Sequence, residues 1–412
     1  MSTNSRPSIS VEDAIDIIIR STAHLEPETV SLVDAGGRIL AEDIVAGADI
    51  PAFDNSAMDG YAVRAADITG ATRERPARLA IRGEVRAGGD LLRLDDPESA
   101  VRIMTGAPIP PSADTVVMVE DTAETDGAVS IYDAVPMGSN IRRAGEDIPR
   151  GAVTLTAGER LRASEIGVLA SLNASTVRVA RRPRVAIIST GDEVIEVGAP
   201  ARDGVVRNSN AYILREEVRR TGGEPTYLGI APDTLEATRD LLARASEHDV
   251  IITSGGVSMG RYDFVRDALA SIGFDISIES ILMKPGKPCV FGRRDSTLFF
   301  GLPGNPVSTQ VAFLQFVRPA LLALMGARKR DKPLVRAILE EPIDKKPGRV
   351  HFIRGVFTIE NGEFRVRTTG PQGSGILRSM SRANCLIILP ADMRRAERGD
   401  RVTIQLIDHD EV

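Results

Sequence analysis

The sequence predicts a multidomain fold of the α/β plus β class. We expect a central, mostly parallel α/β sheet domain, a small β-rich inserted domain and a C-terminal β domain. Strand-like and helix-like segments alternate from residue 185 onward, which is typical of a parallel sheet with helices on both faces. Short β-prone runs separated by Gly, Pro and Asp fill residues 79–135 and return in residues 333–412.

The alternating region starts after Arg182-Pro183, where we expect a new domain to begin. Its helices and strands follow one another in the order strand Val185–Ser189, helix Ala211–Thr221, strand Glu224–Ile230, helix Asp233 to about His248, strand Asp249–Thr253 and helix Phe264–Ile272. The pattern Asp233-Thr-Leu-Glu236 predicts a helix cap. After further strands over residues 276–301, Asn305 and Pro306 begin a long apolar helix that Pro319 interrupts.

The regions around the alternating part have their own signals. Ser10-Val-Glu-Asp13 predicts the capped start of an amphipathic helix. The stretch Ile50–Val63 is so polar and rich in turn formers that we expect it to lie outside any core, and Ala163–Leu172 predicts a helix. The charged run Arg328–Lys332 marks a linker or a solvated helix end.

The composition excludes several classes of protein. A chain of 412 residues is long enough for two to four domains, and a net charge of -6 argues against nonspecific nucleic-acid binding. Cys289 and Cys385 lack metal-ligand spacing, so neither a zinc site nor a disulfide framework is expected. No basic, apolar leader is recognised and no apolar run approaches the ~18 residues of a membrane span. We therefore expect a cytoplasmic protein without membrane contact.

A strand followed by small residues predicts a ligand loop at Asp249–Asp263. Ligands of open α/β sheets bind beyond the carboxyl ends of the strands, where Ser254, Gly255 and Gly256 would lie. Adjacent glycines let backbone N–H groups converge on an anion, and Asp263 could hold a counter-cation. A tight strand-to-helix turn is the alternative.

Other loops of the same domain carry similar residues. Thr190–Glu193, Pro232-Asp233 and Gly301–Pro306 also follow predicted strands, so together they predict a cleft along one edge of the sheet. Gly301-Leu-Pro-Gly-Asn-Pro306 would present free N–H groups to a phosphate or another oxyanion. A purely structural entry into the helix is the alternative.

Charged side chains in these loops predict anion and cation contacts. Lys284-Pro-Gly-Lys-Pro288 places two lysines on a stiff turn that favours an anion, unless it is only a solvated turn. The carboxylates of Glu193, Asp233 and Asp263 suit Mg²⁺, which prefers oxygen ligands, although each could instead be a cap or a solvated side chain.

Several catalytic motifs are missing from the sequence. It has no Gly-x-Gly-x-x-Gly after the first strand of the α/β region, no Gly-x-x-x-x-Gly-Lys-[Ser/Thr] and no Gly-x-Ser-x-Gly. Dinucleotide oxidoreductases, P-loop NTPases and serine-dependent covalent catalysis are therefore disfavoured. Transfer chemistry driven by positioning, a cation and oxyanion contacts remains.

An ordered set of motifs along almost the whole chain resembles the MoeA family of molybdopterin molybdenumtransferases, and is also similar to the C-terminal region of gephyrin. These motifs are Asp54–Ala62, Thr105-Gly-Ala107, Gly145–Ile148, Ser189–Glu193, Ser254–Ser258, Lys284–Pro288, Gly301–Pro306 and Phe352-Ile-Arg-Gly355.

The resemblance implies an elongated homodimer of four-domain subunits with active sites shared between subunits. The family inserts molybdate into adenylylated molybdopterin with Mg²⁺ and releases AMP and molybdenum cofactor. The implied domains are an α/β molybdopterin-binding domain (1–26 and 183–331), a linking domain (27–46 and 147–182), a small β-rich domain (47–146) and a C-terminal β domain (332–412). The adenylyltransferase of the same pathway and recipient molybdoenzymes are further expected partners.

The resemblance and the loop chemistry together assign roles to individual residues. The expected catalytic residues are Asp59, Asp147, Glu193, Asp233, Asp263 and Lys284, and the expected metal ligands are Glu193, Asp233 and Asp263. The expected substrate-binding residues are Thr105, Ser254, Gly255, Gly256, Lys287, Gly301, Pro303, Gly304, Asn305, Pro306, Arg354 and Ser374. Asp59 and Asp147 would come from the second subunit.

The sequence departs from the family at one position. Many relatives have lysine where this chain has Ser280, which removes one positive charge and leaves the choice between molybdate and tungstate open. Two other functions remain as alternatives, namely a non-catalytic pterin-binding scaffold and adenylylation of molybdopterin by ATP.

Overall fold

The computed structural model describes residues 7–256 and 264–408, and its central unit is a six-stranded sheet. Four strands are parallel: β16 (Glu224–Ala231), β13 (Arg184–Thr190), β17 (Val250–Ser254) and β21 (Thr297–Leu302). Strands β20 (Val290–Arg294) and β18 (Asp275–Ile278) complete one edge in antiparallel orientation. The predicted, mostly parallel sheet is confirmed.

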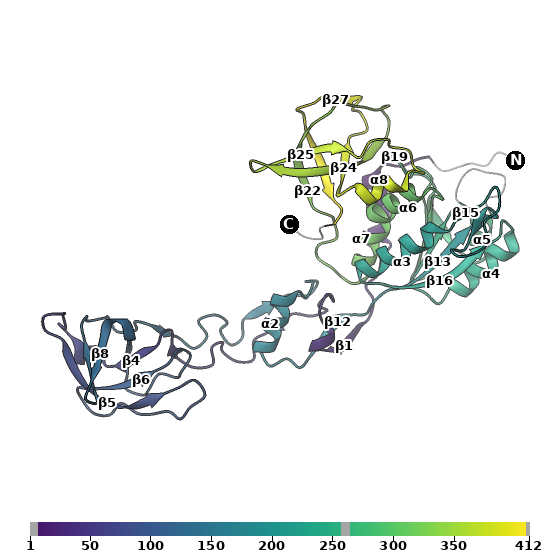
Figure 1. The fold of residues 1–412 in the computed structure, drawn as a ribbon. Coiled ribbons are helices and arrows are strands. Elements are labelled where there is room, and N and C mark those ends of the chain that lie inside the picture. The colour runs from purple at the N-terminus through teal and green to yellow at the C-terminus, as the bar shows by residue number, and fades with distance from the viewer. Residues whose placement is uncertain (1–6, 257–263, 409–412) are drawn as a thin grey trace.

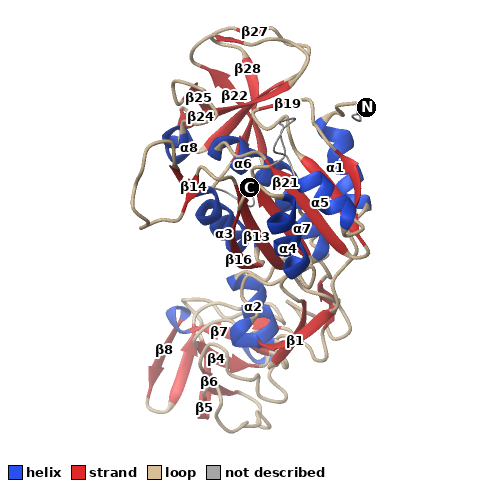
Figure 2. Cartoon of the chain, turned by 90° about the vertical axis from the view of Figure 1, so that its right-hand side faces the viewer, coloured by secondary structure: helices blue, strands red, loops and turns tan. Residues whose placement is uncertain are grey.

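Helices cover both faces of this sheet (Figure 2). Side chains of β13 alternate between two cores, because Val185 and Ile187 point to one face while Ala186 and Ile188 point to the other. The first core contains residues of α1 (Val11–Arg20), α3 (Ser209–Thr221), α6 (Pro306–Ala312) and α7 (Arg318–Leu324). The second contains residues of α4 (Leu235–Ala245) and α5 (Val265–Ser271).

The helix caps in the structure agree with those predicted from the sequence, except for one. Ser10 Oγ accepts a hydrogen bond from the Asp13 N–H at 3.0 Å, and Gly222 ends α3 with a φ of 106°. Helix α4, however, is capped by Thr234, whose Oγ1 accepts from the Ala237 N–H at 3.3 Å. The prediction that Asp233 caps this helix is wrong, so its carboxylate is available for another contact.

The long apolar helix is interrupted where the sequence predicts it. A π-helical segment, Phe313–Val317, lies between α6 and α7 and ends just before Pro319, whose missing N–H cannot continue the helical ladder. The 19-residue stretch Pro306–Leu324 is long and apolar enough to cross a membrane, so the expectation that no apolar run approaches this length is wrong. Of the most apolar part of this stretch, 94% is buried inside the protein, as in a helix of a hydrophobic core.

A second six-stranded sheet, whose strands lie between residues 60 and 131, forms the β lobe at the far end of the molecule in Figure 1. Its strands, in spatial order, are β7 (Thr115–Met118), β4 (Gly60–Val63), β6 (Ser99–Ile103), β5 (Ala77–Val85), β9 (Ala128–Ile131) and β8 (Thr122–Thr125). The expectation that Ile50–Val63 lies outside a core is wrong for β4, whose four residues are buried. Gly60 is required there because a Cβ would lie 2.0 Å from the Val117 carbonyl oxygen.

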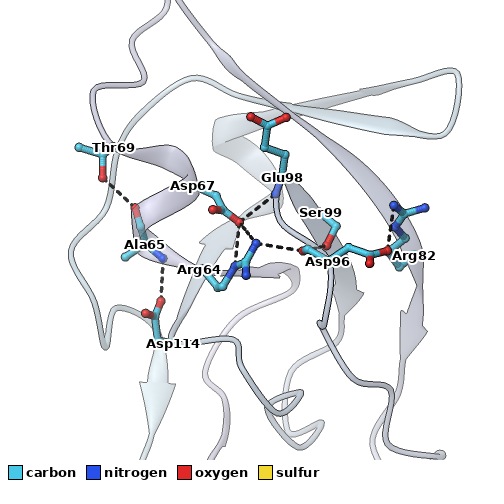
Figure 3. A network of polar contacts seen from close by, with 9 residues as sticks. All are labelled: Arg64, Ala65, Asp67, Thr69, Arg82, Asp96, Glu98, Ser99 and Asp114. Atoms are coloured by element: carbon cyan, nitrogen blue, oxygen red, sulfur yellow. Dashed lines mark hydrogen bonds and ion pairs between the residues drawn. The ribbon is translucent and has the colours of Figure 1, made fainter.

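Polar contacts hold the turn after β4 against neighbouring strands (Figure 3). The Arg64 guanidinium donates to the Asp67 carboxylate at 2.7 Å and to the Asp96 carbonyl oxygen at 3.0 Å. Arg82 in turn pairs with the Asp96 carboxylate at 3.0 Å. The 3₁₀ turns η2 (Ala65–Ile68) and η3 (Val119–Asp121) and the pair β3 (Asn55–Ser56) and β10 (Ile141–Arg142) complete the lobe.

A small linking unit lies between the β lobe and the central sheet (Figure 1). It contains α2 (Ala163–Ser171), which confirms the predicted helix, the 3₁₀ turn η1 (Leu32–Asp34) and two short antiparallel pairs. These pairs are β1 (Pro27–Ser31) with β12 (Thr176–Ala180) and β2 (Ile44–Val45) with β11 (Val153–Leu155). Leu40, Leu161 and Leu169 form its small core.

The C-terminal unit is a curled sheet, as the short β runs predict. Its order is β19 (Met283–Lys284), β24 (Val350–Glu360), β25 (Glu363–Thr368), β22 (Leu334–Leu339), β28 (Arg401–Leu406) and β26 (Cys385–Leu389), and β26 also pairs with β24. The pair β23 (Ile343–Asp344) and β27 (Arg395–Ala396) and helix α8 (Leu377–Arg382) complete it. Because β19 belongs to this sheet, Lys284 is attached to the C-terminal unit.

Candidate active site

A cleft of about 700 Å³ lies at the carboxyl ends of the parallel strands β13, β17 and β21. This sheet cleft is where ligands of open α/β sheets bind. It brings together several residues predicted for the site, namely Glu193, Asp233, Ser254, Gly255, Gly256, Gly304, Asn305 and Pro306. Val194 of β14 (Val194–Ile195) and Val206 of β15 (Val206–Arg207) line its outer side.

The two glycines after β17 shape the floor of the sheet cleft. Gly255 and Gly256 have φ values of 93° and 63°, which favour glycine. A Cβ on Gly255 would lie 2.7 Å from the Thr190 Oγ1, and one on Gly256 would lie 2.9 Å from the same atom. The Gly255 N–H already donates to the Leu302 carbonyl oxygen at 2.9 Å. Of the two backbone N–H groups predicted to bind an anion, the one on Gly255 is therefore already used.

The acidic side of the sheet cleft is formed by Glu193 and Asp233. Burial and the charges of Asp192 and Glu193 raise the pKa of the Asp233 carboxyl, although a hydrogen bond that this carboxyl accepts from the Asp192 backbone N–H opposes the shift. Crowded carboxylates of this kind fit a hard divalent cation that shares oxygen ligands with a substrate. Within residues 7–256 and 264–408, no group of three or more His, Cys, Asp or Glu side chains forms a metal cluster. The third predicted ligand, Asp263, lies outside the described residues.

The loop after β21 contributes less than the sequence predicts. Gly301 lies inside β21, where it pairs with Val290 and Thr253, and the buried Pro303 carbonyl accepts from Thr309 Oγ1 at 2.5 Å. At the helix start, the Val307 N–H donates to the Ser374 carbonyl oxygen at 3.2 Å. The expected row of free N–H groups is therefore partly occupied, because the C-terminal unit packs onto this helix end.

A second cavity, of about 480 Å³, lies between the Lys284 turn and the C-terminal unit. This basic cavity is lined by Lys284, Pro285, Ile343, Asp344, Lys345, Lys346, His351, Phe352, Ile353, Arg354, Gln372 and Arg394. Five of these side chains are Lys or Arg and one is Asp. The cavity is thus suited to an anion, whereas the sheet cleft carries carboxylates.

Arg354 is the most deeply buried cation of the basic cavity, with 1% of its surface exposed. Its Nε donates to Ser379 Oγ at 3.0 Å and its Nη2 to the Gly373 carbonyl oxygen at 3.0 Å. Burial lowers the pKa of the guanidinium to about 10. Both partners are neutral, and no carboxylate of the described ranges forms an ion pair with it. A buried charge of this kind favours an anionic ligand.

The neighbours of Arg354 differ in their charge. Burial and the nearby Lys345, Lys284 and Arg349 lower the pKa of His351 to about 4, so this imidazole is neutral near pH 7. The Lys345 Nζ donates to the carbonyl oxygens of Pro390, Ala391 and Met393 at 2.6, 3.2 and 2.8 Å. Because the Lys345 ammonium group already donates to three carbonyl oxygens, Lys284 and Arg354 are better placed to bind an anion.

The Thr369–Ile376 loop lies between the two cavities. Gln372 lines the basic cavity, Gly375 lines the sheet cleft, and Ser374 is half-buried between them. Lys287 is exposed and lines neither cavity. The Ser280 hydroxyl bonds that of Ser8 at 2.6 Å, so this side chain is engaged with the N-terminal segment.

The remaining predicted residues lie in or beside the β lobe. Asp59 Oδ1 accepts from the Thr105 N–H and hydroxyl, and both hydrogen bonds lower the pKa of this exposed carboxyl. Asp147 is also exposed, and its N–H donates to the Ile50 carbonyl oxygen at 3.1 Å. Figure 1 shows this lobe at the opposite end of the molecule from the central sheet. A single chain therefore does not bring Asp59, Thr105 or Asp147 to the sheet cleft.

Sequence reasoning missed several residues of the sheet cleft, among them Arg207, Asn208 and Asn210. Asn208 Oδ1 accepts from the Ala211 N–H at 3.2 Å and thereby caps α3, while Asn210 contacts two other walls of the cleft. The pattern Asn208-Ser-Asn210 before a predicted helix was a usable capping signal.

Known families match nearly the whole chain in the same order as its structural units. The MoeA N-terminal region (domain I and II) matches residues 9–173, a probable molybdopterin binding domain matches 186–323, and the MoeA C-terminal region (domain IV) matches 336–407. The chain belongs to the MoeA family.

Individual relatives match this chain over almost their full length. The molybdopterin molybdenumtransferase of Haemophilus influenzae is 38% identical over 388 residues, covering 93% of this chain and 95% of the relative. That of Bacillus subtilis is 35% identical, covering 98% of this chain and 95% of the relative. The predicted MoeA family and the transferase class are confirmed.

A solved MoeA structure has the same fold. The molybdopterin biosynthesis moeA protein from Pyrococcus horikoshii OT3 has a TM-score of 0.85 and 32% identity, covering 97% of this chain and 100% of that chain. The predicted multidomain α/β plus β class is therefore confirmed for this MoeA chain.

Proposed function

We propose that this MoeA-family protein is a molybdopterin molybdenumtransferase that inserts molybdate into adenylylated molybdopterin and releases AMP and molybdenum cofactor. The observation that carries the proposal is the pairing of two adjacent cavities of opposite character. The sheet cleft holds Glu193 and Asp233, and the basic cavity holds Lys284 and the buried Arg354. The names of the relatives, molybdopterin molybdenumtransferase, support the transfer of molybdenum to molybdopterin.

The sheet cleft is the proposed seat of the molybdopterin nucleotide. Its volume of about 700 Å³ is suitable for a ligand of this size. The Ser254 hydroxyl and the turn at Gly256 would bind the phosphates, and Glu193, Asp233 and Asp263 would hold Mg²⁺. When bound, Mg²⁺ neutralises negative charge on the phosphate oxygens. The carboxylates orient the nucleotide for transfer.

The basic cavity is the proposed seat of molybdate, a tetrahedral dianion. Lys284 and Arg354 attract and orient it, and the Arg354 guanidinium is held by Ser379 and Gly373 before any ligand binds. A preorganised cation needs little rearrangement when the anion arrives. Lys287 and Ser374, which were also predicted to bind the substrate, do not line this cavity.

We further propose a homodimer in which the β lobe of one subunit completes the site of the other. The β lobe, beside whose strands β4 and β6 Asp59 and Thr105 lie, is far from the central sheet of its own chain, and this separation supports the arrangement (Figure 1). In the dimer, Asp59 and Asp147 would close the site that the second chain forms. The same proposal includes the domain boundaries given by the resemblance and a cytoplasmic location. It also includes contacts with the pathway's adenylyltransferase and with recipient molybdoenzymes.

AMP release tests the proposed reaction. Purified protein is given adenylylated molybdopterin, molybdate and Mg²⁺, and AMP is quantified by chromatography. We expect AMP release that depends on molybdate, and its absence alongside a competent relative would contradict the proposal. Pyrophosphate release from ATP and molybdopterin would instead indicate an adenylyltransferase, and nucleotide binding without turnover would indicate a scaffold.

A further inference from the structure

The Asn210 side chain joins separate walls of the sheet cleft. Its Nδ2 donates to Ser254 Oγ at 2.7 Å and to the Gly304 carbonyl oxygen at 2.7 Å. Asn210 belongs to α3, Ser254 ends β17 and Gly304 follows β21, so one amide group connects three segments that are distant in sequence. Asn210 is only 8% exposed, and all three residues line the cleft.

The direction of these hydrogen bonds follows from the chemistry of the partners. A carbonyl oxygen only accepts, so the nitrogen of the Asn210 amide must face Gly304. The second N–H of the same nitrogen then points to Ser254, whose oxygen is the acceptor. The Ser254 hydroxyl hydrogen is not used in this contact. Within the described ranges, this is the one hydrogen bond seen for Ser254 Oγ, so its O–H can donate to a ligand.

The other end of the Asn210 amide supports a functional role. In the part of the chain that the structure describes, Asn210 Oδ1 is buried and has no hydrogen-bond partner. A buried acceptor without a partner destabilises a protein, so this contact is not optimised for stability alone. What the amide does provide is a fixed donor that defines the orientation of the Ser254 hydroxyl.

We propose that Asn210 is a positioning residue that holds the Ser254 hydroxyl as a hydrogen-bond donor to a phosphate oxygen of the molybdopterin nucleotide. The identity of the ligand rests on the proposed function. Phosphate oxygens only accept, so the serine must donate, and a donor at position 210 is the partner that leaves the serine hydrogen available. An acceptor at position 210 would turn that hydrogen away from the cleft.

Asn210→Asp tests this inference, because it keeps the size of the side chain and converts the donor into an acceptor. We expect KM for adenylylated molybdopterin to rise about tenfold or more and kcat to stay within about threefold. In a Ser254→Ala background, Asn210→Asp should have a much weaker effect on KM, because the contact through which it acts is gone. The factor by which it raises KM should be smaller there than in the wild type, by about fivefold or more. Thermal unfolding of each variant checks the fold.

The outcome of this double-mutant cycle is decisive. Equal factors in both backgrounds would show that Asn210 does not act through Ser254 and would overturn the inference. Should Asn210→Asp not fold, Asn210→Ala replaces it, with coupling of the same sign expected. Calorimetric binding of AMP to the same four proteins separates the two proposals. If the AMP affinities are coupled but the wild type shows no turnover, the proposed reaction is rejected and the role of Asn210 is kept. If the wild type neither binds AMP nor turns over, both the reaction and the role of Asn210 are overturned.

Discussion

Thr105 holds the Asp59 carboxylate, because it donates its N–H at 2.7 Å and its hydroxyl at 2.8 Å to the same carboxylate oxygen. These two bonds lower the pKa of Asp59 and fix an ionised carboxylate on the surface of the β lobe. An exposed acid that is oriented so firmly is poised to contact something outside its own lobe.

Asp59→Asn should reduce AMP release by about 100-fold or more if this carboxylate acts in the site. Its fold should be retained, since Asp59 is exposed and the amide oxygen still accepts from Thr105. Activity and thermal unfolding are measured together. Exposed Asp126→Asn, in a β-hairpin of the same lobe, is the control and should leave activity unchanged. Full activity of Asp59→Asn would remove this residue from the proposed site.

Co-expression of Asp59→Asn and Lys284→Ala tests the shared site. In a two-fold dimer, half of the randomly formed assemblies are mixed, and one of their two sites carries neither substitution. At a molybdate concentration well below the raised KM of Lys284→Ala, about one quarter of wild-type activity should therefore return. Differently tagged subunits allow the mixed dimer to be purified. An inactive mixed dimer would show that both residues serve the site of one chain.

Lys284→Ala should raise KM for molybdate by about tenfold or more, because it removes a charged hydrogen-bond donor from the basic cavity. Lys287→Ala is the matched control from the same turn. Lys287 is exposed and lines neither cavity, so its KM should change by less than about threefold. Equal effects of the two substitutions would argue against the basic cavity as the molybdate seat.

Asp233→Asn should raise the Tm of the ligand-free protein by about 1 to 2 °C at pH 7 while it lowers activity. The pKa of this acid is raised in the folded state, so its ionisation disfavours folding. The difference in Tm should grow as the pH rises from the ordinary pKa of aspartate through the raised value, and it should vanish below both. Calorimetry across pH checks this.

Addition of Mg²⁺ provides a second readout for Asp233. Magnesium should raise the Tm of the wild type, EDTA should reverse the shift, and Asp233→Asn should respond less. Exposed Asp240→Asn on α4 is the matched control and should behave as wild type. Identical magnesium shifts in wild type and Asp233→Asn would contradict a metal role.

Asp249→Asn should lower the Tm by about 2 to 4 °C at pH 7. The Asp249 carboxylate accepts from Arg181 at 2.7 Å through each of two nitrogens and from the Arg184 N–H at 2.7 Å, beside the junction with the linking unit. Burial opposes ionisation, but these bonds outweigh it and lower the pKa. The stabilisation is present above the ordinary aspartate pKa and is lost as pH falls through the lower, folded value.

A pH series therefore checks the role of Asp249. The Tm difference between wild type and Asp249→Asn should narrow below about pH 4. Asp16→Asn, in an exposed pair with Arg20, is the control and should have little effect at any pH. A gap that persists unchanged at acid pH would show that the ion pair is not its cause.

The sequence alone determined the local structure and the family. Periodicity predicted the parallel sheet and its helices, and Ser10 marked the start of α1 correctly, because capping and amphipathicity depend on residues close in sequence. The loops after the parallel strands predicted the sheet cleft, since parallel strands end at one edge. The ordered motifs predicted the MoeA family.

Only the tertiary structure decided which predicted residues meet. It separated Lys284 and Arg354 from the sheet cleft and put the β lobe, which carries Asp59, at the far end of the molecule. It also buried β4, gave the cap of α4 to Thr234 in place of Asp233, and added Asn210 to the site. These outcomes depend on packing between segments that are distant in sequence. Local hydrogen bonding and hydrophobic periodicity carry no information about which distant segment will come to lie beside a given loop.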